Sequence, residues 1–326
     1  MCLQKWERSS KMNRSRQLPK ASWLTRFSIL FAIVAILPRL KDHVLRREYK
    51  VHTDGAVIIS GTSTGLGRAA CGHLAEKHPG ITFYCGVRKK NDGQGYPFTL
   101  ANVVMLLLDV TSDSHVNATI SKVQQSGHDL VGVINNAGFF ELGTVEFQNL
   151  ETVKYHFEVN VFGAYRLTQS ALPLLRSTHG RVISIGSIAG KFSPARFSAY
   201  SGTKHALEAF SDALRRELLV SGISVSLLQP GTFNSPMLDK VADVQEKLSG
   251  RESETEETQS YPTLFEKEKL NSAAKAWKTP VSMDDTIGAL DDAMFGCYPK
   301  ARYVTSEAGS GIPSWIFLRI VGLLPD

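Results

Sequence analysis

Short apolar runs recur along most of the chain, and longer segments with helical spacing of their apolar residues lie between them. The runs cover residues 56–60, 82–87, 103–108, 131–134, 181–185 and 224–228, and residues 301–305 are a candidate for one more. Runs this short and this continuously apolar are typical of buried parallel strands. Because they alternate with helical segments, the predicted fold class is α/β, with a doubly wound parallel sheet in a single domain.

The intervening segments predict the helices. One runs through Ala69, Ala70, Leu74 and Ala75 toward the breaker at Pro79-Gly80, and the others cover residues 112–126, about 150 to 175, and 200–220. Asn160 lies inside the third helix, where asparagine is mildly unfavourable because its side chain competes for backbone hydrogen bonds.

The first 50 residues form a separate region. An apolar run covers residues 27–37 and ends at Pro38, so it is shorter than the ~20 residues that cross a bilayer comfortably. The sequence therefore predicts a hydrophobic leader over residues 1–50 ahead of a main domain at 51–326. A retained anchor or signal-like segment is the first interpretation, and a basic organelle transit peptide or an ordinary packed helix are the alternatives.

Charge divides the chain at the same place. Residues 1–50 hold 12 Lys and Arg against 3 Asp and Glu, a net charge of +9, whereas the remainder holds 25 against 28, a net charge of −3. A slightly acidic main domain argues against a nucleic-acid footprint on it. The four cysteines form no CxxC pair, and no metal-ligand spacing is evident among them and the nine histidines. Cys71 and Cys85 are expected as buried free thiols.

Two later segments break the alternation of strands and helices. Residues 236–280 are charge-rich with little strand pattern, which fits either a mobile lid over a site or a solvated excursion. The tail at 312–324 is apolar nearly all round, so it either covers an apolar substrate cleft or rests on a membrane.

The first predicted strand leads directly into the glycine-rich turn Gly61-Thr62-Ser63-Thr64-Gly65-Leu66-Gly67, and a helix follows. Glycine lets a backbone approach a pyrophosphate, and a helix N-terminus offers N–H donors and the positive end of its dipole. Such a turn alone is a weak indication of a dinucleotide site, because any strand-to-helix turn can carry glycines. Arg88 follows the second strand, where a cation favours a 2′-phosphate, so NADP(H) is favoured over NAD(H); the alternative is a solvated basic turn.

The candidate chemistry converges on one edge of the predicted sheet. Ligands of doubly wound sheets bind beyond the carboxyl ends of the strands. The residues that fall at those ends are Gly61, Arg88, Asp109, Asn135, Ser187 and Gly231. Each is a weak indication alone, and together they predict one site.

The segment from Ser187 to Lys204 carries the reactive groups of that site. Tyr200 lies thirteen residues after Ser187 and four residues before Lys204. On a helix, Tyr200 and Lys204 share one face, and an ammonium beside a phenol favours the phenolate. The phenol then becomes a usable acid or base. An isolated Tyr-x-x-x-Lys is far more often an ordinary surface pair, so the upstream convergence carries the prediction.

These residues together resemble the short-chain dehydrogenase/reductase family over about residues 54–305. The family's TGxxxGxG turn matches Ser60 to Gly67, its NNAG motif matches Asn135 to Gly138, and its PGxxxT motif matches Pro230 to Ser235, with serine for threonine in the first and last. The Gly186-Ser187 pair and the C-terminal residues resemble the hydroxysteroid and retinol dehydrogenase branch more weakly.

The resemblance implies a Rossmann-like fold and an NAD(P)-dependent oxidoreductase. The catalytic residues it implies are Asn160, Ser187, Tyr200 and Lys204. The cofactor-binding residues it implies are Gly61, Thr62, Ser63, Thr64, Gly65, Leu66, Gly67, Arg88, Asp109, Val110, Asn136, Ala137, Gly138, Tyr200, Lys204, Pro230, Gly231 and Ser235. In that scheme Lys204 lowers the pKa of Tyr200, Ser187 holds the substrate oxygen, and Asn160 bends its helix and holds a water. No metal is expected.

The leader, the apolar tail and the branch resemblance favour a hydrophobic alcohol or ketone as the substrate, whether steroid, retinoid or another lipid. They also favour membrane association, with the endoplasmic reticulum first and a mitochondrion or plastid as the alternative. The family implies a homodimer or homotetramer. Two alternative functions are a dinucleotide-binding regulator without turnover, which would tolerate loss of Tyr200 or Lys204, and a sugar-nucleotide epimerase, whose second domain would not fit in residues 236–280.

Overall fold

The computed structural model describes residues 47–233, 235, 236, 239, 255–271, 282–306 and 312–321. Residues 48–326 form a compact unit by themselves. The predicted leader lies almost entirely outside the described residues, and so does much of the segment at 236–280.

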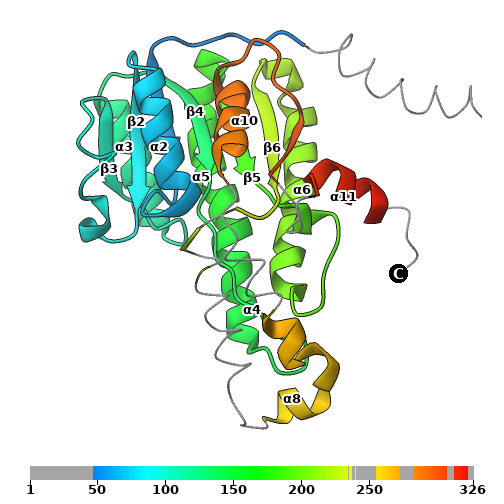
Figure 1. Ribbon diagram of the computed structural model, residues 1–326. Coiled ribbons are helices and arrows are strands. Elements are labelled where there is room, and N and C mark those ends of the chain that lie inside the picture. Colours follow the sequence, from blue (N-terminus) through cyan, green and yellow to red (C-terminus); the bar gives the residue numbers. More distant parts are fainter. Residues whose placement is uncertain are drawn as a thin grey trace, which may run out of the picture. The chain divides into compact units, whose positions relative to one another are not determined.

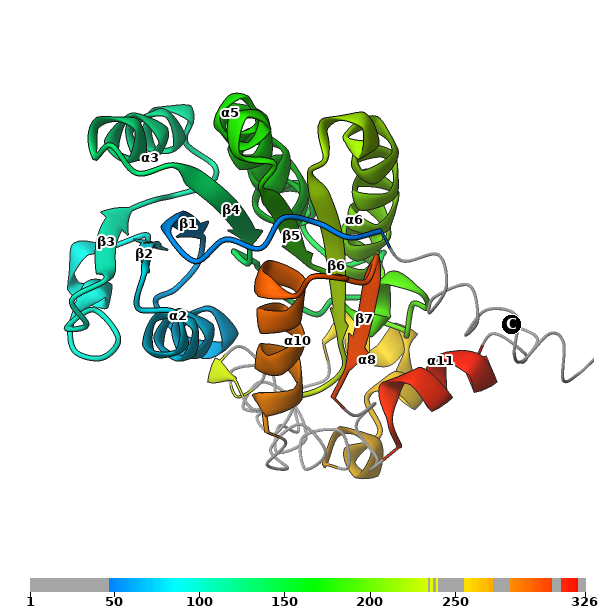
Figure 2. The ribbon, with the colours of Figure 1, turned by 90° about the horizontal axis from the view of Figure 1, so that it is seen from above.

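The centre of this unit is a seven-stranded parallel sheet in the order β3-β2-β1-β4-β5-β6-β7 (Figure 2). The strands are β1 (Gly55–Ile59), β2 (Ile81–Val87), β3 (Val103–Leu107), β4 (Leu130–Asn135), β5 (Arg181–Ile185), β6 (Ser224–Pro230) and β7 (Arg302–Thr305). Strand order reverses between β1 and β4, which pair with each other. This confirms the predicted doubly wound parallel sheet and each expected strand, because the runs are mostly apolar, as strands buried on both faces require.

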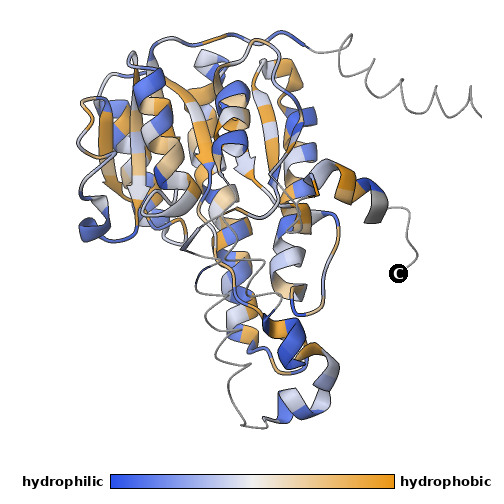
Figure 3. Cartoon of the chain, in the orientation of Figure 1, coloured by the Kyte–Doolittle hydropathy of each residue, from blue (hydrophilic) through white to orange (hydrophobic). Residues whose placement is uncertain are grey.

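Helices cover both faces of the sheet (Figures 1 and 2). On one face lie α3 (Asp113–Gln125), α5 (Gly163–Thr178) and α6 (Ser198–Glu217), and on the other lie α2 (Gly65–Lys77) and α10 (Asp284–Phe295). Alternate residues of β1 enter the two cores: Ala56 and Ile58 pack with the first group of helices, and Val57 and Ile59 with the second. The apolar strands therefore lie between two layers of amphipathic helices (Figure 3).

The helix expected at about 150 to 175 is divided into three parts. The α-helix α4 (Leu150–Phe157) leads into one π-helical turn, η2 (Glu158–Phe162), and then into α5. Asn160 lies in the π turn and is buried. Single π turns shift the face that a helix presents, and they are frequent at functional sites. The expected bend at Asn160 is thus a local widening of the helix.

Cys71 and Cys85 are buried, as expected, but they are not free thiols. They form a disulfide between α2 and β2, with the Cα atoms 6.7 Å apart. The prediction was wrong because it considered spacing along the chain, whereas the packing of α2 over β2 brings these two positions together across the helix–sheet interface.

The amino-terminal edge of the sheet is held by an unusual buried cation. Arg181 at the start of β5 is fully buried and donates to the carbonyl oxygens of Ala293 and Lys50, each at 3.0 Å. Burial lowers its pKa. The chain entering the domain is therefore joined to β5 and to α10 through one guanidinium group.

Part of the predicted lid is described and packs on the main domain. The residues at 255–271 include α8 (Glu256–Ser260) and a short turn of helix, η5 (Pro262–Leu264). Glu257 accepts hydrogen bonds from the Thr144 hydroxyl at 2.6 Å and the Thr144 N–H at 3.2 Å. The Tyr261 hydroxyl donates to Glu146 at 2.8 Å. These contacts join α8 and η5 to the loop after β4.

The apolar tail forms α11 (Ser314–Val321), where Trp315 is half exposed. The ring of Phe317 lies 4.9 Å from that of Phe192, in the loop that precedes α6. Within the part of the chain that the structure describes, every helix is too short or too polar to span a lipid bilayer.

Candidate active site

The glycine-rich turn lies between β1 and α2 at the carboxyl edge of the sheet. Gly61 and Gly65 have φ values of +70° and +57°, which L side chains rarely adopt. The Thr62 hydroxyl donates to the Gly86 carbonyl at 2.9 Å and anchors the turn to the end of β2. A side chain at Gly67 would lie 2.3 Å from the Gly61 carbonyl oxygen. The residue types of this turn are therefore imposed by its close backbone packing.

Asn136 fixes the turn to the end of β4. Its amide nitrogen donates to the carbonyl oxygens of Ser60 and Gly61, each at 2.9 Å. The Ser60 hydroxyl accepts from the N–H groups of Asn136 and Ala137 at 3.1 and 3.0 Å. These four bonds lock β1 to β4 where strand order reverses, the position at which doubly wound sheets bind their ligands.

The start of α2 suits an anionic group. Its N-cap residue, Thr64, makes no side-chain capping hydrogen bond, and the first turn carries no acidic residue in this fully described helix. The N–H groups at a helix N-terminus have no partner within the helix, and the dipole favours negative charge there. Ser235 approaches Gly65, where an added Cβ would lie 3.7 Å from the Ser235 Cβ. The donor set fits the pyrophosphate of a dinucleotide.

Asp109 and Arg88 follow the neighbouring strands β3 and β2. Asp109 accepts from the hydroxyl and the N–H of Thr111 at 2.7 and 3.0 Å. Partial burial acts to raise the pKa of Asp109, but these hydrogen bonds and the charge of Arg88 outweigh it and lower the pKa. Arg88 itself is exposed, and Val110, the residue after Asp109, is buried. The pair forms the outer end of the same edge.

Asn160 holds a loop against α6. Its amide oxygen accepts from the Phe139 N–H at 2.7 Å, and its amide nitrogen donates to the Phe139 carbonyl at 3.0 Å and to the Thr203 hydroxyl at 3.0 Å. Thr203 in turn donates to the Tyr200 carbonyl at 2.7 Å. Asn160 therefore links the segment that follows Gly138 to the helix that carries Tyr200 and Lys204.

Ser187, Tyr200 and Lys204 come together as predicted. A hydrogen bond joins the hydroxyls of Ser187 and Tyr200. The Lys204 Nζ lies 5.4 Å from the centre of the Tyr200 ring and donates to the Ile185 carbonyl at 2.8 Å. Ser187 stands directly after β5, and the other two residues share one face of α6. The cluster therefore brings a phenol, a hydroxyl and an ammonium to the carboxyl edge.

The electrostatics differ from the expectation that Lys204 lowers the pKa of Tyr200. The Tyr200 hydroxyl is enclosed by protein, and burial raises its pKa to about 12, while the Ser187 hydrogen bond acts in the lowering direction. Burial also lowers the pKa of Lys204 to about 8. Both shifts have one cause: a group out of water favours its uncharged form. The i,i+4 spacing gave the neighbours correctly but contained no information on their desolvation.

Two aromatic side chains that the sequence analysis missed border this cluster. The ring centres of Phe140 and Phe197 lie 4.6 and 6.4 Å from that of Tyr200. They come from the loop after β4 and from the residue before α6. Phe140 follows the Asn135–Gly138 motif by two residues, and its apolar side chain so close to that motif was a usable signal. Pro230 and Gly231 end β6 on the same edge, where the Gly231 N–H donates to Thr305.

Comparison with known proteins agrees with this geometry. Residues 55–246 match the family model described as short chain dehydrogenase. An NADPH-dependent 3-dehydrocapnine reductase from Ornithobacterium rhinotracheale is 30% identical over 82% of this chain and 92% of its own length. Retinol dehydrogenase 16 of Rattus norvegicus is 30% identical over 84% of this chain and 87% of its own.

A solved structure supports the same assignment. The crystal structure of a short-chain dehydrogenase from Streptomyces avermitilis superposes with a TM-score of 0.60 at 26% identity, covering 82% of this chain and 92% of that one. The chain is therefore an NAD(P)-dependent oxidoreductase that acts on CH–OH or C=O groups. It belongs to the short-chain dehydrogenase family.

Proposed function

We propose that this protein exchanges a hydride between NADP(H) and a hydrophobic alcohol or ketone, with Tyr200 as the general acid and base. The observation that carries the proposal is the shared position of the Tyr200, Ser187 and Lys204 side chains at the carboxyl edge of the sheet. A phenol that is hydrogen-bonded to a second hydroxyl can give a proton to a carbonyl oxygen or take one from an alcohol.

Each side chain of the cluster has a distinct task. Ser187 donates to the substrate oxygen and holds it beside Tyr200. Lys204, held by the Ile185 carbonyl, presents its ammonium toward the ring of Tyr200 and favours the phenolate when the proton leaves. A dinucleotide, when bound, would supply or accept the hydride. Asn160 maintains the position of α6 through Thr203.

The dinucleotide would bind at the turn from Gly61 to Gly67 at the start of α2. This turn is bordered by Asn136 to Gly138 and by Pro230, Gly231 and Ser235. Arg88 supports a preference for NADP(H), because an exposed guanidinium can bind a 2′-phosphate with two hydrogen bonds. The NADPH dependence named for the Ornithobacterium relative agrees with this choice.

The surroundings of Tyr200 support an apolar substrate. Phe140 and Phe197 flank its ring, and the Arg196 guanidinium stacks 4.7 Å over the ring of Phe265 in the described part of the lid. An aromatic wall favours a steroid, a retinoid or another lipid over a small polar alcohol. The retinol dehydrogenase relative is consistent with that class.

We further propose that the enzyme associates with membranes, with the endoplasmic reticulum as the first location, through the leader at residues 1–50. The leader combines a net charge of +9 with the apolar run at 27–37. Basic residues attract anionic lipid surfaces, and an apolar segment adds burial. Trp315, which is half exposed on α11, offers a second apolar contact.

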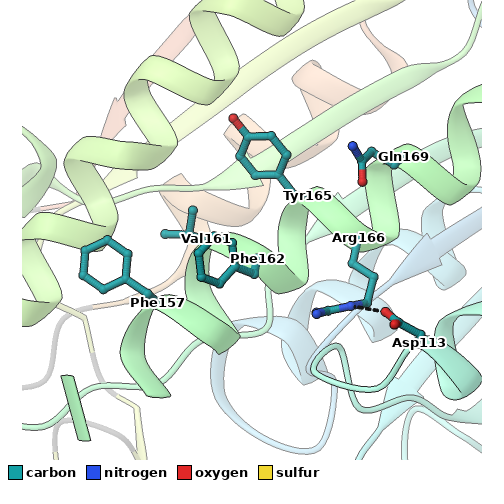
Figure 4. A pocket seen from close by; sticks show the side chains of 7 residues that line it. All are labelled: Asp113, Phe157, Val161, Phe162, Tyr165, Arg166 and Gln169. Atoms are coloured by element: carbon teal, nitrogen blue, oxygen red, sulfur yellow. Dashed lines mark hydrogen bonds and ion pairs between the residues drawn. The ribbon is translucent and has the colours of Figure 1, made fainter. Parts of the chain in front are cut away.

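The outer face of α5 supports the proposal of a homodimer or homotetramer. A surface pocket of 610 Å³ is lined by Asp113, Phe157, Val161, Phe162, Tyr165, Arg166 and Gln169 (Figure 4). Phe162 is 51% exposed and Tyr165 is 41% exposed. Arg166 is fixed at the rim by Asp113, by Glu158 at 2.9 Å and by the Val110 carbonyl at 2.6 Å. Exposed aromatic side chains beside a fixed arginine are typical of protein interfaces.

Tyr200→Phe tests the acid–base role, because it keeps the ring and removes the proton. We expect kcat for NADPH-linked reduction to fall by about 10²–10⁴ while NADPH still binds. The assay uses a steroid ketone, retinal and a long-chain methyl ketone, with Tyr298→Phe as an exposed control. A loss below about tenfold would exclude general acid–base catalysis by Tyr200, and a wild-type enzyme inactive on the whole panel would favour the non-catalytic regulator.

Arg88→Ala tests the cofactor preference. The KM for NADPH should rise about tenfold or more, because a hydrogen bond to a charged group contributes about 1.5–3 kcal/mol. The KM for NADH should stay the same. Lys90→Ala, a nearby exposed cation, is the matched control. An unchanged ratio of the two KM values removes Arg88 from cofactor selection.

Phe162→Asp tests the proposed subunit interface by placing a charge on its exposed aromatic face. Light scattering after size-exclusion chromatography should give a dimer or tetramer for the wild type and a monomer for the variant. Val220→Asp, which alters a residue that is 91% exposed elsewhere, should leave the mass unchanged. A monomeric wild type contradicts the proposal.

Vesicle flotation tests the membrane proposal. The full chain should float with vesicles that contain anionic lipid, and a chain that begins at Glu48 should remain mostly in the dense fraction, because it lacks the basic apolar leader. If both chains float equally, the leader is not the anchor. If neither floats, the protein does not bind such surfaces by itself.

A further inference from the structure

We propose that Glu208 is a positioning residue that fixes the loop from Ser187 to Lys191, here called the Ser187 loop, relative to Lys204. The inference rests on the proposed roles of Ser187 and Lys204. Glu208 contacts neither Ser187 nor Tyr200 in any interaction found among the described residues, and it acts through Lys191 at the end of the loop.

Glu208 occupies the turn of α6 directly after Lys204. It is 7% exposed, which is unusual for a glutamate, and charged groups are rarely buried without partners. Its carboxylate binds the Lys191 ammonium at 2.8 Å and the Arg302 guanidinium at 2.9 Å. Its other oxygen accepts from the Gln229 side-chain amide. One carboxylate thus joins three elements besides its own helix.

The loop after β5 rests directly on α6 beside this carboxylate. The Gly190 N–H donates to the Ser187 carbonyl at 3.0 Å, and the Lys191 N–H donates to the Ile188 carbonyl at 2.9 Å, so the loop is a tight turn of helix. A side chain at Gly190 would lie 2.9 Å from the Lys204 carbonyl oxygen and 3.4 Å from the Glu208 Cγ. The absence of a side chain at Gly190 lets the loop pack directly on α6. The Lys191–Glu208 ion pair then holds the end of the loop on the same helix.

The same carboxylate reaches the strand that ends at the cofactor edge. Gln229 is fully buried and is followed by Pro230 and Gly231 at the end of β6. Arg302, in β7, is fixed a second time by Asp212, one turn further along α6, at 2.8 Å. The α6 helix, β6, β7 and the Ser187 loop are therefore joined by one network of ion pairs and hydrogen bonds.

The positive charges of Lys191 and Arg302 explain why an anionic side chain suits position 208. Two cations and an amide converge on the carboxylate, so its desolvation is compensated by several hydrogen bonds. In that arrangement a shift of the loop separates Lys191 from a buried anion. An error of about 1 Å in the position of a reacting group can cost on the order of 10²-fold in rate. Ser187, four residues before Lys191, is the group that such a shift would displace.

Lys191→Met tests the link without leaving the buried carboxylate unpaired, because Arg302 and Gln229 remain bound to it. Exposed ion pairs contribute about 0–1 kcal/mol, so the melting temperature should change little. The kcat on the best ketone of the panel should fall about tenfold or more, with the KM for NADPH unchanged. Lys77→Met, which removes the half-exposed Lys77–Asp291 pair on another helix, is the matched control.

A double-mutant cycle separates positioning from general destabilisation. If Glu208 acts through Ser187, Glu208→Gln should lower kcat in the wild type but have little further effect in Ser187→Ala. A full, multiplicative loss in the Ser187→Ala background overturns the inference and leaves the proposed function intact. A Ser187→Ala variant with normal kcat instead overturns the proposed role of Ser187.

Hydrogen exchange provides a readout that does not depend on turnover. Amides of the segment from Ala189 to Lys191 should exchange faster in Lys191→Met and in Glu208→Gln than in the wild type, while those in α2 should not change. Equal exchange in all three proteins overturns the inference even if no substrate of the enzyme is ever found.

Discussion

The Lys204 ammonium lies out of water and donates to a single backbone carbonyl, that of Ile185, at 2.8 Å. A buried cation is costly unless hydrogen-bonded, and this bond fixes α6 against the end of β5. The position of Tyr200 on α6 and of Ser187 after β5 both follow from it. The arrangement of these three side chains therefore depends on a contact between one of them and the sheet itself. The rings of Phe140 and Phe197 border Tyr200 beside that contact.

Desolvation has an opposite effect on the two titrating groups. It raises the pKa of Tyr200 from 10.0 to about 12 and lowers that of Lys204 from 10.5 to about 8, so the two values move apart. For both groups burial favours the uncharged form, and a charge placed nearby would shift both pKa values. The dry site thus couples the protonation of Tyr200 to whatever charge lies beside it.

The sequence was sufficient for the sheet because parallel strands buried on both faces are mostly apolar, and residues 181–185 were placed without error although Arg181 and Ser184 are polar. The motif residues at the strand ends were also found, since topology alone brings them to one edge. The π turn at Glu158–Phe162 was not predicted, because it depends on hydrogen bonds from Asn160 to Phe139 and Thr203, far away in the chain. The Cys71–Cys85 disulfide was missed because it depends on the packing of α2 over β2.

The buried Arg181 also determines where the polypeptide entering the domain is attached to the sheet. Arg181 is the first residue of β5, and its guanidinium binds the Lys50 carbonyl. Tyr200 lies beyond the last residue of the same strand. A force on the polypeptide ahead of Lys50 would therefore act at the amino-terminal end of β5. There Arg181 also binds α10 through the Ala293 carbonyl. The cluster of Ser187, Tyr200 and Lys204 lies at the opposite, carboxyl end of β5.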